Sequence, residues 1–124
     1  MSQKILVADD EPNIVISLEY LLKREGYTVL IARDGQEALE TIAREQPDLV
    51  LLDVMMPKKT GFEVCQSVRA SDKLRATKIL MLTARGRDTD VTKGLALGAD
   101  AYITKPFSTR ELKQKVAQML AGQA

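Results

Sequence analysis

The sequence predicts an α/β fold: a five-stranded parallel sheet with helices on both faces. Five short apolar runs alternate with five segments of about ten to fifteen residues that carry helix signals. The runs are continuously rich in Val, Ile and Leu, as is typical of strands buried on both faces of a parallel sheet. A strand and a helix repeated five times imply right-handed crossovers and an α/β sandwich.

The expected strands can be given in chain order. They are Lys4–Ala8, Thr28–Ala32, Leu49–Leu52, Lys78–Leu82 and Ala101–Thr104. The first helix begins near Pro12, which suits a first helical turn, and ends at Gly26. Two pairs have the spacing of a capping box and mark the second and last helices: Asp34 with Glu37, and Ser108 with Glu111. The third and fourth helices are expected over Gly61–Ala70 and Thr89–Leu97.

The size and composition of the chain exclude several classes of protein. At 124 residues the chain is near the commonest size of a domain, and we expect one domain over residues 1–124. The net charge of +1 provides no global attraction for nucleic acid or an anionic membrane. The sequence has neither a signal peptide nor an apolar run long enough for a membrane span, and its single cysteine, Cys65, cannot form an internal disulfide. We therefore expect a cytoplasmic protein that binds neither a membrane nor, directly, nucleic acid.

Histidine is absent from the sequence. Its absence excludes Ser-His-Asp and Cys-His catalysis and every histidine-ligated metal site, and a single cysteine argues against zinc. Any chemistry must therefore use carboxylates, hydroxyls, lysine, arginine and a hard cation.

Polar side chains follow four of the expected strands. Asp9 and Asp10 come after the first strand, Asp53 after the third, Thr83 after the fourth and Lys105 after the last. Because the carboxyl ends of parallel strands share one edge, where ligands bind in open α/β sheets, these groups are expected to converge. Three acids, a hydroxyl and an amine suit a divalent metal and a phosphoryl group.

Each of these residues also has a simpler interpretation. Asp9 and Asp10 could cap the free N–H groups of a helix, and Thr83 and Lys105 could be ordinary residues at strand ends. Asp53 changes the balance, because three carboxylates at a dry crevice repel one another, and without a cation at least one should resist ionisation. Magnesium, which prefers oxygen ligands, is the expected cofactor.

Taken together, these motifs resemble the receiver domain of two-component response regulators over essentially the whole chain. The matching residues are Asp9-Asp10, Asp53 with Met56-Pro57 and Gly61, Thr83-Ala84, and Lys105-Pro106-Phe107. The ordered set is highly specific. The resemblance implies a flavodoxin-like sheet with strand order 2-1-3-4-5, an order taken from the family and not from the residues.

The resemblance also implies a role for each residue. Asp53 would accept a phosphoryl group from a kinase phosphohistidine and form an acyl phosphate. Asp10 would bind magnesium directly, Asp9 through water, and Met55 through its backbone carbonyl. The implied catalytic set is Asp53, Thr83 and Lys105; the metal set is Asp9, Asp10, Asp53 and Met55; the switch pair is Thr83 and Tyr102. The family's Lys-Pro bond, here Lys105-Pro106, is typically cis.

We interpret the chain as a phosphorylation-dependent signalling switch that catalyses its own phosphorylation and dephosphorylation but is mainly a regulatory protein. Its expected partners are a histidine kinase or phosphotransfer protein and an unknown downstream protein target. Three alternatives remain: a receiver-like docking module that is never phosphorylated, a flavodoxin-like FMN-binding protein, and a phosphatase with an aspartyl-phosphate intermediate. The acidic strand ends argue against FMN, whose phosphate they would repel. Asp53-Val54-Met55 lacks the second acid of the phosphatase D-x-D pattern.

The sequence departs from the family pattern at two places. Lys59-Thr60 stands where many members have an apolar residue and an acid, a change expected to affect the loop or a partner contact and not the chemistry. Val91 and Ala101 stand where the winged-helix DNA-binding branch usually has a basic and an acidic residue. Without these charges we expect a monomer or a weak dimer.

Overall fold

The computed structural model describes residues 3–121 and confirms the expected architecture. The strands are β1 (Lys4–Ala8), β2 (Thr28–Ala32), β3 (Leu49–Asp53), β4 (Lys78–Ala84) and β5 (Ala101–Lys105). The helices are α1 (Pro12–Arg24), α2 (Gly35–Glu45), α3 (Gly61–Ala70), α4 (Asp88–Ala96) and α5 (Thr109–Ala121). All strand pairs are parallel and the order is β2-β1-β3-β4-β5.

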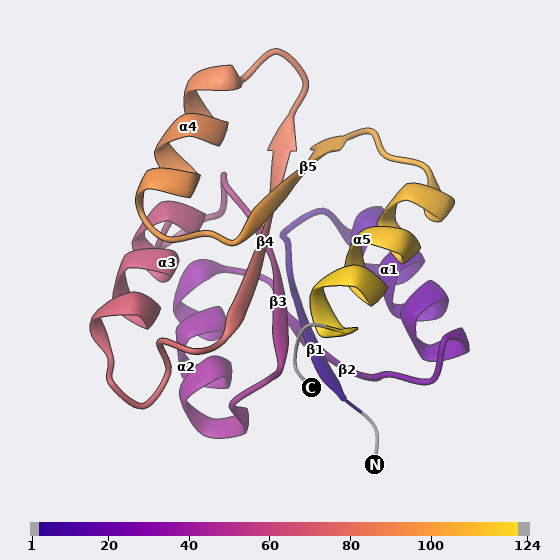
Figure 1. Cartoon of the computed structure of the whole chain (residues 1–124), viewed down its shortest axis with the longest axis horizontal. Coiled ribbons are helices and arrows are strands. Elements are labelled where there is room, and N and C mark those ends of the chain that lie inside the picture. Colours follow the sequence, from indigo (N-terminus) through magenta and orange to yellow (C-terminus); the bar gives the residue numbers. More distant parts are fainter. Residues whose placement is uncertain (1–2, 122–124) are drawn as a thin grey trace.

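The sheet separates two layers of helices. Helices α2, α3 and α4 cover one face and α1 and α5 the other (Figure 1). Successive side chains of a strand point to opposite faces, so each central strand contributes to both cores. In β3, Val50 and Leu52 pack with α2 and α3, whereas Leu49 and Leu51 pack with α1 and α5, and all four are fully buried. This double burial explains the continuous apolar runs.

Three strands extend beyond the apolar residues that predicted them. β3 includes Asp53, β4 continues to Ala84 and β5 to Lys105. Backbone pairing causes the extension, because Asp53 is paired with Leu82, and Ala84 with Lys105. The polar residues at these ends are therefore held by the sheet and not by mobile loops. The Lys105–Pro106 bond is cis, as the resemblance implied.

The starts of α2 and α5 each show one half of the predicted capping box, the hydrogen bond accepted by the N-cap side chain, and α3 adds a cap that was not predicted. Asp34 accepts a hydrogen bond from the backbone N–H of Glu37 (2.8 Å), and Ser108 accepts one from Glu111 (3.0 Å). α3 begins with a complete capping box that the sequence analysis did not identify: Thr60 and Glu63 each accept a hydrogen bond from the backbone N–H of the other. Thr60, one of the two residues that depart from the family pattern, thus caps α3. α4 starts and ends one residue before the predicted bounds.

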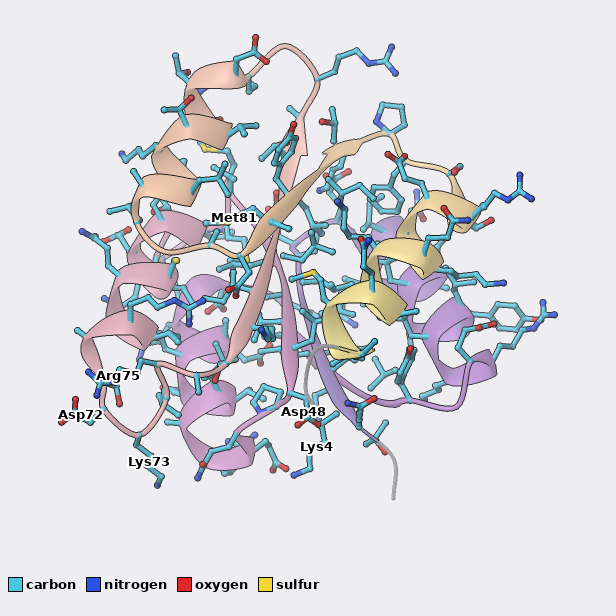
Figure 2. All side chains as sticks on the ribbon, viewed as in Figure 1. Lys4, Asp48, Asp72, Lys73, Arg75 and Met81 are labelled. Carbon is cyan, nitrogen blue, oxygen red and sulfur yellow. The ribbon has the colours of Figure 1, made fainter. Side chains whose placement is uncertain are left out.

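Charged side chains near the edge of the sheet opposite the carboxyl ends form hydrogen bonds and ion pairs there. The Asp48 carboxylate accepts a hydrogen bond from the backbone N–H of Lys4 (2.8 Å). In the loop between α3 and β4, Asp72 lies 3.4 Å from the guanidinium of Arg75 (Figure 2). Within residues 3–121, no helix is both long and apolar enough to cross a membrane.

Candidate functional site

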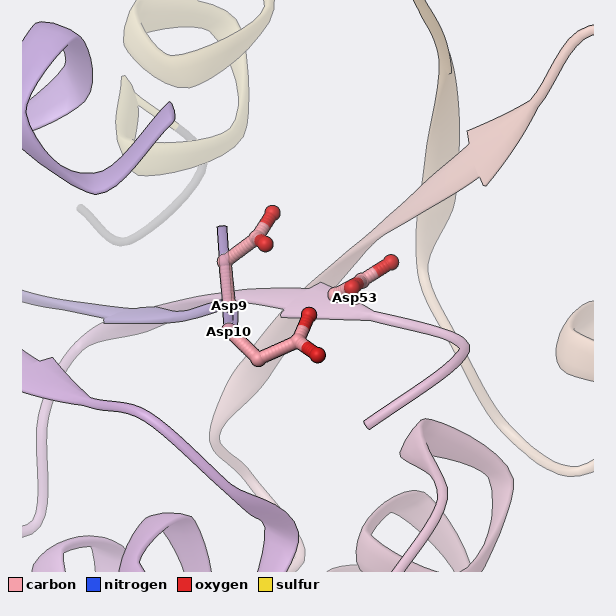
Figure 3. Close-up of side chains that lie close together, drawn as sticks. All are labelled: Asp9, Asp10 and Asp53. Carbon is pink, nitrogen blue, oxygen red and sulfur yellow. The ribbon is translucent and has the colours of Figure 1, made fainter. Parts of the chain in front are cut away.

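Three carboxylates meet at the carboxyl edge of the sheet. One oxygen each from Asp9, Asp10 and Asp53 lies within 4.8 Å of the other two (Figure 3). The backbone fixes two of the three residues, since the N–H of Asp9 donates to Ala32 of β2 (3.1 Å) and Asp53 is paired with β4. Asp9 is completely buried, Asp53 is 8% exposed and Asp10 faces solvent. The sheet thus forces the three acids together, as the strand ends predicted.

This crowding has an electrostatic consequence. Burial and the neighbouring Asp9 carboxylate raise the pKa of Asp53 from 3.8 to about 7, although the Lys105 ammonium opposes the shift. A raised pKa is expected for a carboxyl group that must carry its charge beside another one in a poorly solvated place. A hard divalent cation would remove the conflict, and the three oxygen donors suit magnesium. The residues present therefore fit the expected metal.

Asp9 and Asp10 differ in how free they are to bind a metal. One oxygen of Asp9 accepts the backbone N–H of Glu11 (2.9 Å), and the other accepts the ammonium of Lys105 (2.8 Å). Asp10 makes no side-chain hydrogen bond within the described part of the chain. Asp10 is therefore the freer of the two carboxylates to contact a cation.

Lys105 lies among three acids. Its Nζ atom is 2.8 Å from Asp9, 3.0 Å from Glu11 and 3.5 Å from Asp53. Burial, the largest single effect, lowers the pKa of Lys105, but the hydrogen bonds to Asp9 and Glu11 together with the negative charges of Asp53 and Asp9 outweigh it, so the pKa lies above the ordinary value and the group remains a cation. Glu11 was not among the site residues predicted from the sequence. The sequence feature that could have indicated it is its position, as a third acid directly after Asp9 and Asp10.

An open pocket of ≈ 470 Å³ gives access to Asp53. Asp10, Met55 and Lys105 line it, together with Arg87, whose guanidinium is paired with Asp90 at 2.9 Å. Gly61 allows the loop after β3 to fold back over the acceptor, because a Cβ atom there would lie 2.3 Å from the carbonyl oxygen of Asp53. The pocket is large enough to admit a phosphoryl group to the Asp53 carboxylate.

Three predicted site residues, Asp9, Thr83 and Tyr102, do not line this pocket. The side chain of Thr83 is buried and its hydroxyl donates to the carbonyl oxygen of Ile103, at 3.5 Å. Together with Tyr102 it lines a neighbouring pocket of ≈ 310 Å³ between β4, β5 and α4. Tyr102 is 42% exposed. The predicted switch pair therefore shares a space next to the acceptor, not within its pocket.

Comparison with known proteins agrees with this geometry. Residues 5–117 match the model of the response regulator receiver domain. The chain is 51% identical, over 120 residues, to the alkaline phosphatase synthesis transcriptional regulatory protein PhoP of Bacillus subtilis. That match covers 97% of the chain but 49% of PhoP, so the chain spans about half the length of this curated relative.

Solved structures with the same fold include two informative neighbours. The chemotaxis response regulator CheY4 of Vibrio cholerae has a TM-score of 0.90 and 34% identity, over 96% of this chain and 99% of that one. The receiver domain of a sensor histidine kinase from Pseudomonas aeruginosa has a TM-score of 0.90 and 29% identity, over 98% and 99%. The latter structure contains a magnesium ion coordinated in its active-site cleft.

Proposed function

The chain belongs to the response regulator receiver domain family, and we propose that Asp53 is its phosphoacceptor. Receiver domains take phosphoryl groups from histidine kinases, and we expect the donor here to be a histidine kinase or a phosphotransfer protein. The observation that carries the proposal is the position of Asp53, buried at a strand end between two other carboxylates and the Lys105 ammonium, yet open to a pocket.

In the proposed reaction an oxygen of the Asp53 carboxylate attacks the phosphorus atom of a phosphohistidine. A phosphorus–oxygen bond forms as the phosphorus–nitrogen bond breaks, and the imidazole leaves as the acyl phosphate is made. Lys105 offsets negative charge on the phosphoryl oxygens. Asp10, Asp53 and the carbonyl group of Met55 would hold magnesium, with Asp9 bound through water. When bound, this ion supplies charge neutralisation for the same oxygens.

Phosphorylation would then favour a second conformation of the β4–α4 region. The Thr83 hydroxyl would exchange the Ile103 carbonyl for a phosphoryl oxygen, a charge-assisted hydrogen bond available only after phosphorylation. The present bond of 3.5 Å is long for an O–H donor, so little is lost by breaking it. Tyr102 would turn into the space beside Thr83. The result is a population shift that changes the face formed by α4, β5 and α5, where a downstream protein would bind.

Phosphorylation by a small-molecule donor tests this function directly. Wild-type protein incubated with acetyl phosphate and magnesium is expected to gain the mass of one phosphoryl group, and Asp53→Asn none. Asp72→Asn is the matched control, since Asp72 is an exposed aspartate outside the site. Labelling of Asp53→Asn would show that another residue accepts the group. Absence of labelling in wild type, with this donor and with a phosphorylated kinase, would favour a docking module instead.

A further inference from the structure

The ammonium group of Lys105 is directed toward the loop between β1 and α1 more than toward the acceptor. A lysine ammonium has three donors, and N–H···O hydrogen bonds are usually about 2.7–3.2 Å long. Asp9 at 2.8 Å and Glu11 at 3.0 Å are within this range, whereas Asp53 at 3.5 Å is outside it. The cation that should serve the phosphoryl group is therefore held by two other acids.

Glu11 occupies the N-cap position of α1, but its side chain does not cap the helix. Glutamate is not among the side chains preferred at this position, where a capping oxygen accepts from the N–H of the second or third helical residue. The hydrogen bond from the Glu11 N–H to Asp9 fixes the backbone here. The Glu11 side chain, 59% exposed, reaches to Lys105 instead.

The two acids that hold Lys105 differ in kind. Asp9 belongs to the cluster of three carboxylates at the metal site, whereas Glu11 lies outside it. The contact between Glu11 and Lys105 therefore does not use any of the oxygens that the cluster offers. It is a separate restraint on the position of the lysine.

We infer that Glu11 is a positioning residue that holds Lys105 on the α1 side of the site, so that an incoming phosphoryl group must compete with Glu11 for the ammonium. This inference rests on the proposed role of Asp53. Glu11 thereby slows phosphorylation and sets how readily the lysine moves to the acceptor. Because a partly exposed ion pair is weak, its removal is expected to raise the rate of phosphorylation about two- to fivefold.

Two substitutions separate the contact from the charge. Glu11→Gln removes the charge and so the ion pair, leaving a neutral amide oxygen that is a weaker acceptor for the ammonium, whereas Glu11→Asp keeps the negative charge on a side chain that is one methylene shorter and no longer reaches the lysine. The control is Glu19→Gln on the same helix, which removes a glutamate paired with Lys23 at 3.0 Å. The initial rate of labelling is measured with acetyl phosphate at saturating magnesium. In this reaction the Asp53–phosphorus bond forms and acetate leaves as its bond to phosphorus breaks.

Faster labelling of both Glu11→Gln and Glu11→Asp, with Glu19→Gln unchanged, is the expected result. If only Glu11→Gln is faster, the charge of Glu11 acts at a distance and the positioning role is wrong. Unchanged or slower labelling of Glu11→Gln also overturns it. A wild-type protein that is not labelled at all overturns the proposed function instead.

A spectroscopic measurement tests the contact without phosphorylation. The ¹⁵N resonance of the Lys105 ammonium, recorded in metal-free protein, is expected to shift in Glu11→Gln and in Glu11→Asp. Glu19→Gln should leave it in place and shift the Lys23 resonance instead. A Lys105 resonance that is identical in wild type and both Glu11 variants would show that the ion pair is absent, and would overturn the inference whatever the labelling rates.

Discussion

The hydroxyl oxygen of Thr83 lies 3.5 Å from the carbonyl oxygen of Ile103, so in this conformation the β4 threonine contacts β5, and it does not line the pocket that opens onto Asp53. Asp53, the proposed acceptor, and Thr83, the switch residue, therefore line different pockets before phosphorylation. The proposed conformational change requires the threonine to change partner, and each half of the process can be tested on its own.

Thr83→Ala is expected to separate phosphorylation from the conformational response. The acceptor, the acidic cluster and Lys105 all remain, so the protein should still be labelled by acetyl phosphate. The hydrogen bond that would draw in the loop after β4 is lost, so amide resonances of Tyr102 and α4 should shift less on phosphorylation. NMR spectra of both forms measure this, with Thr28→Ala at the sheet edge as control. A full response in Thr83→Ala would contradict the role of the hydroxyl.

Magnesium affinity is expected to depend more on Asp10 than on Asp9. Both oxygens of Asp9 already accept hydrogen bonds, whereas Asp10 is exposed and offers its carboxylate freely. Loss of an outer-shell partner usually weakens metal binding by about tenfold or more, so Asp9→Asn should cost about tenfold and Asp10→Asn clearly more. Calorimetric titration compares the two variants, which lose the same charge. If Asp9→Asn binds magnesium more weakly than Asp10→Asn does, the two roles are reversed.

The stability of the metal-free protein should depend on pH through Asp53. Its pKa is raised from 3.8 to about 7, so the folded state keeps a proton that the unfolded chain has lost, and stability falls as the pH rises between these values. Asp53→Asn removes this penalty. At about 1.4 kcal/mol per pKa unit, its gain in free energy of unfolding should be about 2.5 kcal/mol larger near pH 8 than near pH 5.

Urea unfolding without magnesium at the two pH values checks this expectation. Asp72→Asn, which changes an exposed aspartate, should show no such difference. Added magnesium should reduce the gain, because the cation relieves the same repulsion. Equal gains for Asp53→Asn at both pH values would mean that the buried carboxyl is not the source of the effect.

Self-association is expected to be weak. The face of α4, β5 and α5 exposes Leu95 and Tyr102, which offer limited apolar area, while Val91 and Ala101 cannot form a salt bridge across it. Salt bridges at an interface rim contribute about 0–1 kcal/mol each, so their absence weakens a dimer without preventing one. Sedimentation should show a monomer without phosphorylation and at most weak dimerisation with beryllofluoride. A tight dimer at micromolar concentration would contradict this.

The sequence by itself determined the elements of the fold and the gathering of the acids. Continuous apolar runs identify strands buried on both faces, and parallel strands must place their carboxyl ends at one edge, so Asp9, Asp10, Asp53 and Lys105 were all expected along that edge. The strand order came from the family resemblance. The capping box of Thr60 and Glu63 was also readable from the sequence, since its residues are only three apart.

Only the tertiary structure decided which partner each side chain takes. Lys105 has three carboxylates within 3.5 Å, and its pairing with Glu11 joins residues 94 positions apart. Thr83 bonds to Ile103 because the register of β4 and β5 brings that carbonyl within reach. Such choices depend on differences in distance of less than 1 Å among groups of similar chemistry. Residue type and spacing along the chain carry no information at that scale, whereas the packed sheet and its loops do.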